Sequence, residues 1–157
     1  MRVFSTLIFG LVEWAARNGF ASESAPADAR RRQQLRRRMG VRGETFAYWY
    51  LRRHGYVIVA RNFRAPGLKG EIDLVGFDGP VLSFIEVKTR TAKPGALALP
   101  EDAITMDKRR FLGRMARRFL AERKLDGVRW RFDVLAIESS PGKRPVVRLH
   151  KAAFADQ

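Results

Sequence analysis

The chain has 157 residues, which suits a single domain with a tail, and 31 lysines and arginines against 16 aspartates and glutamates give a net charge of +15. It contains no cysteine, which excludes disulfides, thiolate zinc sites and cysteine nucleophiles. With only two histidines, any bound metal would be held mainly by carboxylate and carbonyl oxygens, as Mg²⁺, Mn²⁺ and Ca²⁺ are.

The first forty residues are predicted to be an extension of the folded part. An apolar run over 3–12 follows Arg2 and is too short to span a bilayer; it resembles a secretory signal, but a docked helix or a mis-assigned start explains it equally well. Residues 22–40 are interpreted as a linker. Its arginine triplets, 30–32 and 36–38, fit either a phosphate-binding arm or a solvated tether.

The folded domain is predicted over 41–157, with helices and strands in the order of a mixed α/β protein. Residue patterns predict helices over 43–54 and 100–124 and strands over 56–60, 71–77, 81–88, 128–134 and 146–150. Loops are expected over 61–70 and 89–99. Strict alternation over 128–134 indicates a strand with one buried face.

Positive charge extends along the whole chain, because each of the segments 1–40, 41–100, 101–127 and 128–157 has a basic excess. Such a field attracts polyanions, of which nucleic acid is the commonest. Compositional drift is the alternative, since arginine outnumbers lysine 24 to 7.

Charged residues interrupt two strands that are otherwise hydrophobic: Asp73 in one, and Glu86 and Lys88 in the next. Carboxylates in apolar strands are costly to bury unless they are paired or bound to a cation. Side chains alternate along a strand, so Glu86 and Lys88 share a face. These residues could form a structural ion-pair cluster or a site that carries chemistry.

The hairpin between the strands decides whether the two faces coincide. Pro80 lacks an N–H, which disfavours a two-residue turn and favours a four-residue turn over 77–80. That turn would pair Gly76 with Val81 and make Asp73 a diagonal neighbour of Glu86, on the same face.

Asp73, Glu86 and the Val87 carbonyl would then form an oxygen site of the kind that Mg²⁺ or Mn²⁺ takes. A metal held there would polarise a phosphate and lower the pKa of an attacking water. Lys88 would orient that water or stabilise charge on the phosphate in the transition state.

The spacing of Asp73 and Glu86-Val87-Lys88 resembles the D…(D/E)-x-K signature of the restriction-endonuclease-like superfamily. More narrowly, the chain resembles the YraN-like family of small bacterial proteins over about residues 40–140. The matching blocks are Gly43-Glu44, Arg61-Asn62-Phe63-Arg64, Gly70-Glu71-Ile72-Asp73-Leu74, Glu86-Val87-Lys88-Thr89-Arg90, Ile104 to Lys108, and Arg131-Phe132-Asp133-Val134.

This resemblance implies a restriction-endonuclease-like fold, with a mixed central sheet flanked by helices, akin to archaeal Holliday-junction resolvases. It implies a cytoplasmic, Mg²⁺- or Mn²⁺-dependent nuclease acting on DNA, including structured or branched DNA, and a two-fold homodimer. Glu44 occupies the place of a glutamate that joins the metal-site carboxylates in those enzymes. Ile72 stands where the signature's name has proline, at a position that varies within the superfamily.

Further residues are expected to contact nucleic acid, and they follow or flank the presumed cleft: Arg61, Arg64, Thr89, Arg90 and Lys108. Solvated surface charge is the alternative interpretation for the arginines. A nuclease fold that binds nucleic acid or a DNA-processing partner without cutting is the alternative function. Asp133, on an alternating strand, is interpreted as a buried partner for an arginine.

Overall fold

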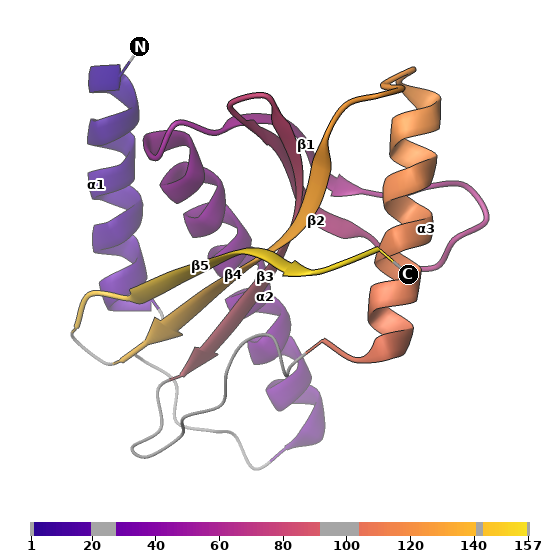
Figure 1. Ribbon diagram of the computed structural model, residues 1–157. Coiled ribbons are helices and arrows are strands. Elements are labelled where there is room, and N and C mark those ends of the chain that lie inside the picture. The colour runs from indigo at the N-terminus through magenta and orange to yellow at the C-terminus, as the bar shows by residue number, and fades with distance from the viewer. Residues whose placement is uncertain (1, 20–27, 92–103, 141–142, 157) are drawn as a thin grey trace.

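The computed structural model describes residues 2–19, 28–91, 104–140 and 143–156. A five-stranded sheet lies between α1 and α2 on one face and α3 on the other (Figure 1). The elements are α1 (Arg2–Gly19), α2 (Ala29–Arg53), β1 (Val57–Phe63), β2 (Ile72–Asp78), β3 (Val81–Thr91), α3 (Met106–Glu122), β4 (Trp130–Ser139) and β5 (Val146–Phe154). The predicted mixed α/β class is confirmed.

Helix α2 is longer than the sequence pattern predicted. It begins at Ala29 with Asp28 as N-cap, whose side chain accepts a hydrogen bond from the Arg30 N–H (3.0 Å). It ends before Gly55, which adopts φ +92°, as the predicted stop requires. The linker prediction is therefore wrong over 29–40, where the helix is continuous; residues 22–27 lie outside the described part of the chain.

Helix α1 packs on α2 and takes part in the core. Phe9 and Ala16 are buried, and the rings of Phe9 and Phe46 lie 5.5 Å apart. Of the expectations for the first residues, the docked helix is therefore the one that agrees with the structure. None of the helices within the described residues is long and apolar enough to cross a membrane.

The sheet order is β1-β2-β3-β4-β5, with β3 and β4 parallel and the other pairs antiparallel. Helix α3 makes the crossover between the two parallel strands, as such a connection requires. Strand β4 is buried on both faces over Phe132–Ile137, so the predicted single buried face is wrong. An interior strand between two helical layers has no side that faces solvent. Its polar residues are therefore buried, where they form hydrogen bonds and ion pairs with neighbouring side chains.

The hairpin register also differs from the prediction. Asp78 pairs with Val81 and Leu74 with Ile85, so the loop is the two-residue Gly79-Pro80. The hydrogen bond that closes such a loop is donated by the residue after Pro80, so the missing proline N–H is no obstacle, and Gly79 supplies φ +59°. The register moves by an even number of residues, which preserves the expected shared face.

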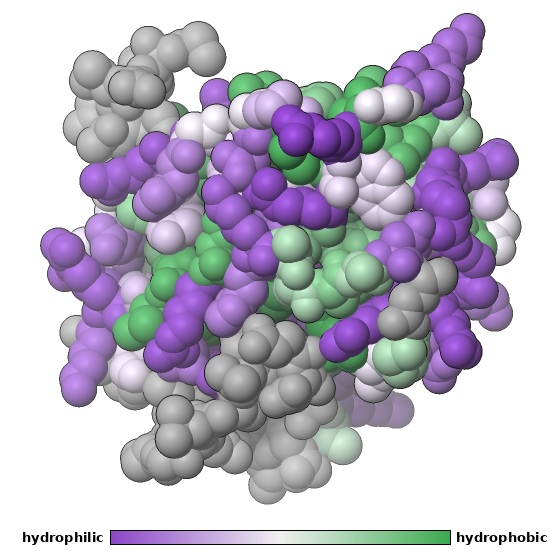
Figure 2. Space-filling model, viewed as in Figure 1, coloured by the Kyte–Doolittle hydropathy of each residue, from purple (hydrophilic) through white to green (hydrophobic). Residues whose placement is uncertain are grey.

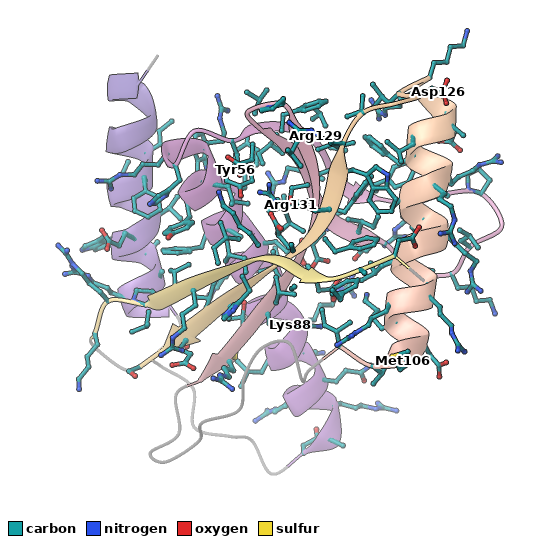
Figure 3. All side chains as sticks on the ribbon, viewed as in Figure 1. Tyr56, Lys88, Met106, Asp126, Arg129 and Arg131 are labelled. Carbon is teal, nitrogen blue, oxygen red and sulfur yellow. The ribbon has the colours of Figure 1, made fainter. Side chains whose placement is uncertain are left out.

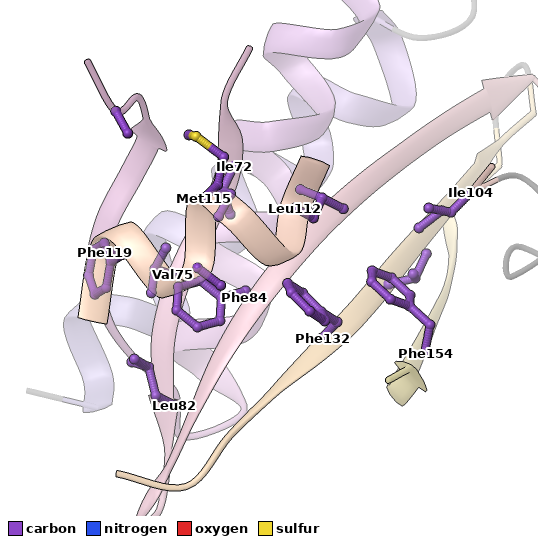
Figure 4. Close-up of a cluster of buried hydrophobic side chains, with 13 residues drawn as sticks. Ile72, Val75, Leu82, Phe84, Ile104, Leu112, Met115, Phe119, Phe132 and Phe154 are labelled. Carbon is purple, nitrogen blue, oxygen red and sulfur yellow. The ribbon is translucent and has the colours of Figure 1, made fainter. Parts of the chain in front are cut away.

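Two hydrophobic cores fill the space between the layers. One joins the sheet to α3, where Leu112, Met115 and Phe119 pack against Phe84 and Phe132 (Figure 4). The other joins the opposite face to α1 and α2. Hydrophilic side chains cover most of the visible surface and are not gathered on one element (Figure 2).

A buried ionic cluster surrounds Asp133 of β4. Asp133 is fully buried and accepts hydrogen bonds from Arg131 Nε (2.8 Å), Ser83 Oγ (2.5 Å) and the Ala152 N–H (2.9 Å). Tyr56 and Arg131 lie side by side at its centre (Figure 3), joined at 3.2 Å. The predicted arginine partner of Asp133 is confirmed.

Helix α3 is shorter than predicted at its start. Thr105 is the N-cap, and its Oγ1 accepts from the Lys108 N–H (3.3 Å). The predicted start over 100–103 and most of the predicted loop at 89–99 lie outside the described residues, and β3 continues to Thr91. Lys108 thus lies in the first turn of α3, next to the sheet.

Candidate active site

A pocket of about 440 Å³ collects most of the residues that the sequence singled out. Its floor comes from β2 and β3 and its wall from α2. The described lining residues are Met39, Gly40, Glu44, Asp73, Glu86, Val87, Lys88 and Thr89. The sheet and α2 thus bring the predicted carboxylates and lysine to one place.

The pocket forms where β2 begins. Strand β2 starts at Ile72, whereas β3 runs on to Thr91, paired with β4 on its other side. Continuing the observed register by one pair beyond Leu74 and Ile85 places Asp73 directly opposite Glu86. Directly opposed side chains are closer than the predicted diagonal neighbours.

The Asp73 carboxyl holds its proton more tightly than an ordinary aspartate. Burial, and secondly the neighbouring Glu86 carboxylate, raise the pKa of Asp73 to about 7. The Val87 N–H opposes this rise by donating to Asp73 Oδ2 at 2.7 Å. Two carboxylates that resist joint ionisation form a pair that a divalent cation would stabilise.

Glu86 is almost fully buried, at 6% exposed. Its Oε1 accepts from Lys88 Nζ at 2.9 Å and lies 3.3 Å from Lys108 Nζ. Its Oε2 is buried, and no described residue donates a hydrogen bond to it. A buried carboxylate oxygen without a donor is costly, and a cation or a bound water would satisfy it.

Glu44 reaches the pocket from α2 and is held by Asn62. Asn62 Nδ2 donates to Glu44 Oε2 at 2.7 Å. Asn62 adopts φ +48° in β1, a conformation that asparagine tolerates better than most residues. Asn62 was expected in a loop over 61–70 and had no predicted role, whereas β1 extends to Phe63 and carries it.

Helix α2 approaches β3 very closely at this point. A Cβ added to Gly43 would lie 1.9 Å from Thr89 Oγ1, so the approach depends on glycine. Thr89 Oγ1 is buried and receives no hydrogen bond from the described residues. The close contact fixes the position of Glu44, the next residue, relative to β3.

The three predicted nucleic-acid-binding arginines are not among the described residues that line the pocket. Arg61 lies over the Tyr48 ring, 4.7 Å from its centroid. Arg64 pairs with Glu71 at 2.8 Å. Arg90 pairs with Glu138, where Arg90 and then Arg148 lower the pKa of the Glu138 carboxyl. Phosphate contact by these arginines would therefore compete with partners in the protein.

The predicted site residues fit a hard cation through their oxygens. Within the described residues, no group of three histidine or carboxylate side chains is arranged to hold a metal. Asp73 and Glu86 nonetheless supply two neighbouring carboxylates in one pocket and one unsatisfied oxygen, the donor chemistry that Mg²⁺ and Mn²⁺ prefer. For Val87, the structure gives an N–H donated to Asp73, and a metal-binding role of its carbonyl stays a prediction.

Comparisons with known proteins agree with the resemblance noted in the sequence. Residues 43–137 match the family described as Uncharacterised protein family UPF0102. A UPF0102 protein of Koribacter versatilis is 44% identical over 115 residues, covering 73% of this chain and 78% of the relative. Proteins with the same family name from Geobacter metallireducens (44% identical; 74% and 91% covered) and Symbiobacterium thermophilum (42%; 76% and 98%) are similar to it as well.

Proposed function

This chain belongs to the UPF0102 family, of the YraN-like type, and we propose from the chemistry of its pocket that it is a metal-dependent nuclease that hydrolyses DNA phosphodiester bonds. The observation that carries the proposal is that Asp73 and Glu86 line one pocket closely enough for Glu86 to perturb Asp73, with Lys88 two residues further along β3 on Glu86. A restriction-endonuclease-like fold, a cytoplasmic location and a two-fold dimer belong to the same proposal, and rest on the resemblance alone.

In the proposed reaction, Asp73 and Glu86 would hold Mg²⁺ or Mn²⁺, and this cation would polarise the scissile phosphate and lower the pKa of the attacking water. Burial and, secondly, repulsion from Glu86 raise the pKa of Asp73, and a cation held by the pair would offset both effects. Lys88 Nζ lies 2.9 Å from Glu86 Oε1, from where it stabilises negative charge that develops on the phosphate. Asn62 orients Glu44 at the pocket wall.

Lys108 is a second cation on Glu86, supplied by α3. Its Nζ lies 3.3 Å from the same oxygen that Lys88 contacts, and it also lowers the pKa of Asp73. In the proposed enzyme Glu86 would help to hold the cation, and the Lys108 ammonium would be available to bind a phosphate oxygen of the substrate. This agrees with its predicted role in nucleic-acid binding.

Cleavage assays test the proposal. Labelled linear, flap and four-way DNA are incubated with the protein and Mg²⁺ or Mn²⁺. We expect cleavage of at least one substrate, loss of that cleavage on chelation, and its loss in the Asp73→Ala and Glu86→Gln variants. Absence of cleavage on all three substrates, or cleavage that survives Asp73→Ala, would contradict the proposal.

A second candidate function is nucleic-acid binding without cleavage. The two lysine contacts to Glu86 favour it, because they neutralise the carboxylate without a metal. This alternative predicts salt-sensitive DNA binding that is unchanged by chelation and by Glu86→Ala, together with no cleavage. Binding that does not change between about 50 and 300 mM salt would argue against it.

A further inference from the structure

A surface made of two aromatic rings and two arginines lies beside the pocket and takes no part in the chemistry proposed for it. The rings of Tyr48 and Trp49, both in α2, meet edge to face with their centroids 5.0 Å apart. The Arg52 guanidinium lies 5.5 Å from the centroid of each ring, and that of Arg61, from β1, lies 4.7 Å from the Tyr48 centroid. These four residues are called the aromatic–arginine surface. Arg61 is exposed, and the other three are half-buried.

The aromatic–arginine surface is joined to the pocket by contacts between the same two elements. Glu44 and Tyr48 are one turn apart on the same side of α2, about 6 Å along its axis. On β1, Asn62 donates to Glu44, and the preceding residue, Arg61, lies over Tyr48. Successive side chains of a regular strand point to opposite faces, yet both of these reach α2, and Asn62 adopts φ +48°, outside the range of a strand. A ligand on this surface therefore lies next to the pocket.

The two guanidinium groups of the surface have no acidic partner among the described residues. Arg52 donates to the Tyr48 hydroxyl at 2.8 Å and otherwise lies over the two rings. The contact that the structure gives for Arg61 is the Tyr48 ring. Arg64, by contrast, pairs with Glu71. A guanidinium held over a ring keeps its other face and its N–H donors for a ligand.

A guanidinium held in this way suits a flat ligand. Aromatic rings and arginine planes are the groups on which proteins stack nucleobases that are not paired. A base on the far side of Arg61 from Tyr48 would leave the contact between these two residues in place. A phosphate at the same arginine would use its charge alone. The rings therefore favour a base as the ligand.

We propose that the aromatic–arginine surface binds an unpaired nucleobase of the strand whose phosphate reaches the pocket. The inference rests on the proposed function and deepens it by naming the substrate class, which is nucleic acid with a single-stranded segment at the cut. Glu44 and Tyr48 are one helical turn apart, and a stacked strand advances about 3.4 Å per nucleotide. The bound base thus belongs to a nucleotide about two positions from the phosphate at Glu44.

A duplex and an acidic peptide are the competing ligands. In a duplex, neighbouring base pairs cover both faces of each base, so the surface would meet only the backbone. An acidic peptide would pair with the guanidinium donors and gain little from the rings. Neither ligand makes use of Tyr48 and Trp49, and each serves as a comparison in the test.

Binding of a fluorescein-labelled thymidine 12-mer in EDTA tests the proposal without cleavage and without metal. A 12-mer of abasic residues carries the same phosphates but no bases, and a blunt duplex carries bases that are already stacked. We expect the unmodified protein to bind the thymidine strand about tenfold more tightly than the abasic strand, an effect of the size that one stacked base gives.

Two substitutions assign this preference to the surface. Arg61→Lys keeps the charge but loses the planar group, and Tyr48→Leu removes the ring. Each should lower the affinity for the thymidine strand about tenfold and leave the affinity for the abasic strand nearly unchanged. Arg61→Lys should also leave the slope of log affinity against log salt unchanged, because the charge is kept.

Arg123→Lys is the matched control. The Arg123 guanidinium lies 4.5 Å from the Phe119 centroid, so the same kind of pair is changed by the same substitution. Arg123 is the C-cap of α3, about 22 Å along the helix from Lys108. This variant should bind the thymidine strand as the unmodified protein does.

Several outcomes would overturn the proposal: equal affinity for the thymidine and abasic strands, equal losses in Arg61→Lys and Arg123→Lys, or displacement of the thymidine strand by polyglutamate more readily than by the abasic strand. Tyr48→Phe keeps the ring and loses the hydroxyl that accepts from Arg52, so it should retain the preference. If Tyr48→Leu does not fold, Arg61→Lys decides the question.

The binding assay also separates this proposal from the nuclease. A preference for bases without cleavage of any substrate would remove the nuclease and leave the aromatic–arginine surface as a binding site. Cleavage without a preference for bases would remove the surface and leave the nuclease.

Discussion

Replacement of Asp73 by asparagine should stabilise the metal-free protein at neutral and higher pH. In the native fold, burial and Glu86 raise the pKa of Asp73 from 3.8 to about 7. Below about pH 4 the carboxyl is protonated in both the folded and the unfolded chain and does not affect the free energy of unfolding. As the pH rises to 7, the unfolded chain ionises more readily than the folded one, and the free energy of unfolding falls. The difference in pKa corresponds to at most roughly 4 kcal/mol. Partial exposure of Asp73 reduces this, so we expect a gain of about 2 kcal/mol.

Asparagine keeps the local geometry that aspartate provides. Its oxygen can still accept from the Val87 N–H, and its amide can donate to the unsatisfied Glu86 Oε2. Urea unfolding of both proteins in EDTA, at pH 4, 6 and 8, measures the effect. The variant should unfold with a free energy close to that of the unmodified protein at pH 4 and above it at pH 8. A variant that is less stable at pH 8, or a difference that does not depend on pH, would refute this explanation of the pair.

Three further predictions concern two supports of the pocket, at Gly43 and Asn62, and the buried ion pair of Asp133 away from it. Gly43→Ala should lower the free energy of unfolding by roughly 1–3 kcal/mol through overpacking. Adding Thr89→Ala should restore most of this loss in the double variant, because it removes the side chain that the new Cβ would meet. Urea unfolding that shows no rescue would contradict the close approach of Gly43 to Thr89 Oγ1. Asp133→Asn should cost about 3 kcal/mol by breaking a buried ion pair while Mn²⁺ affinity, measured by calorimetry, stays the same. Asn62→Ala should weaken Mn²⁺ binding roughly tenfold by releasing Glu44, and unchanged calorimetric affinity would remove Asn62 from the site.

The carboxylate pair could be predicted from the sequence because its signal is local. Asp73 and Glu86 interrupt apolar strands, and the alternation of side chains fixes their faces whenever the hairpin loop has an even number of residues. The register itself was harder to predict. The missing N–H of Pro80 argued against a two-residue loop, although the hydrogen bond that closes such a loop is donated by the residue after the proline. The error moved the pairing by two residues and left the shared face intact.

Features that depend on tertiary packing were not predictable. The helical state of residues 29–40 is determined in part by the Asp28 cap, while an arginine-rich sequence with no apolar stripe offers no helical period to recognise. Burial of both faces of β4 follows from its interior place in the sheet. The contact of Lys108 with Glu86 joins α3 to β3. The apolar stripe of α3 indicates which side of the helix faces the sheet, but it does not specify which strand residue Lys108 meets.

The central claim is that Asp73 and Glu86 together hold a divalent cation. Crystals soaked in Mn²⁺ test it most directly, through anomalous scattering at the pocket. We predict one peak within coordination distance of both carboxylates, about 2.0–2.3 Å from their oxygens, and no peak in Asp73→Asn crystals. A pocket without a peak at saturating Mn²⁺, with Lys88 and Lys108 still on Glu86, would contradict the claim.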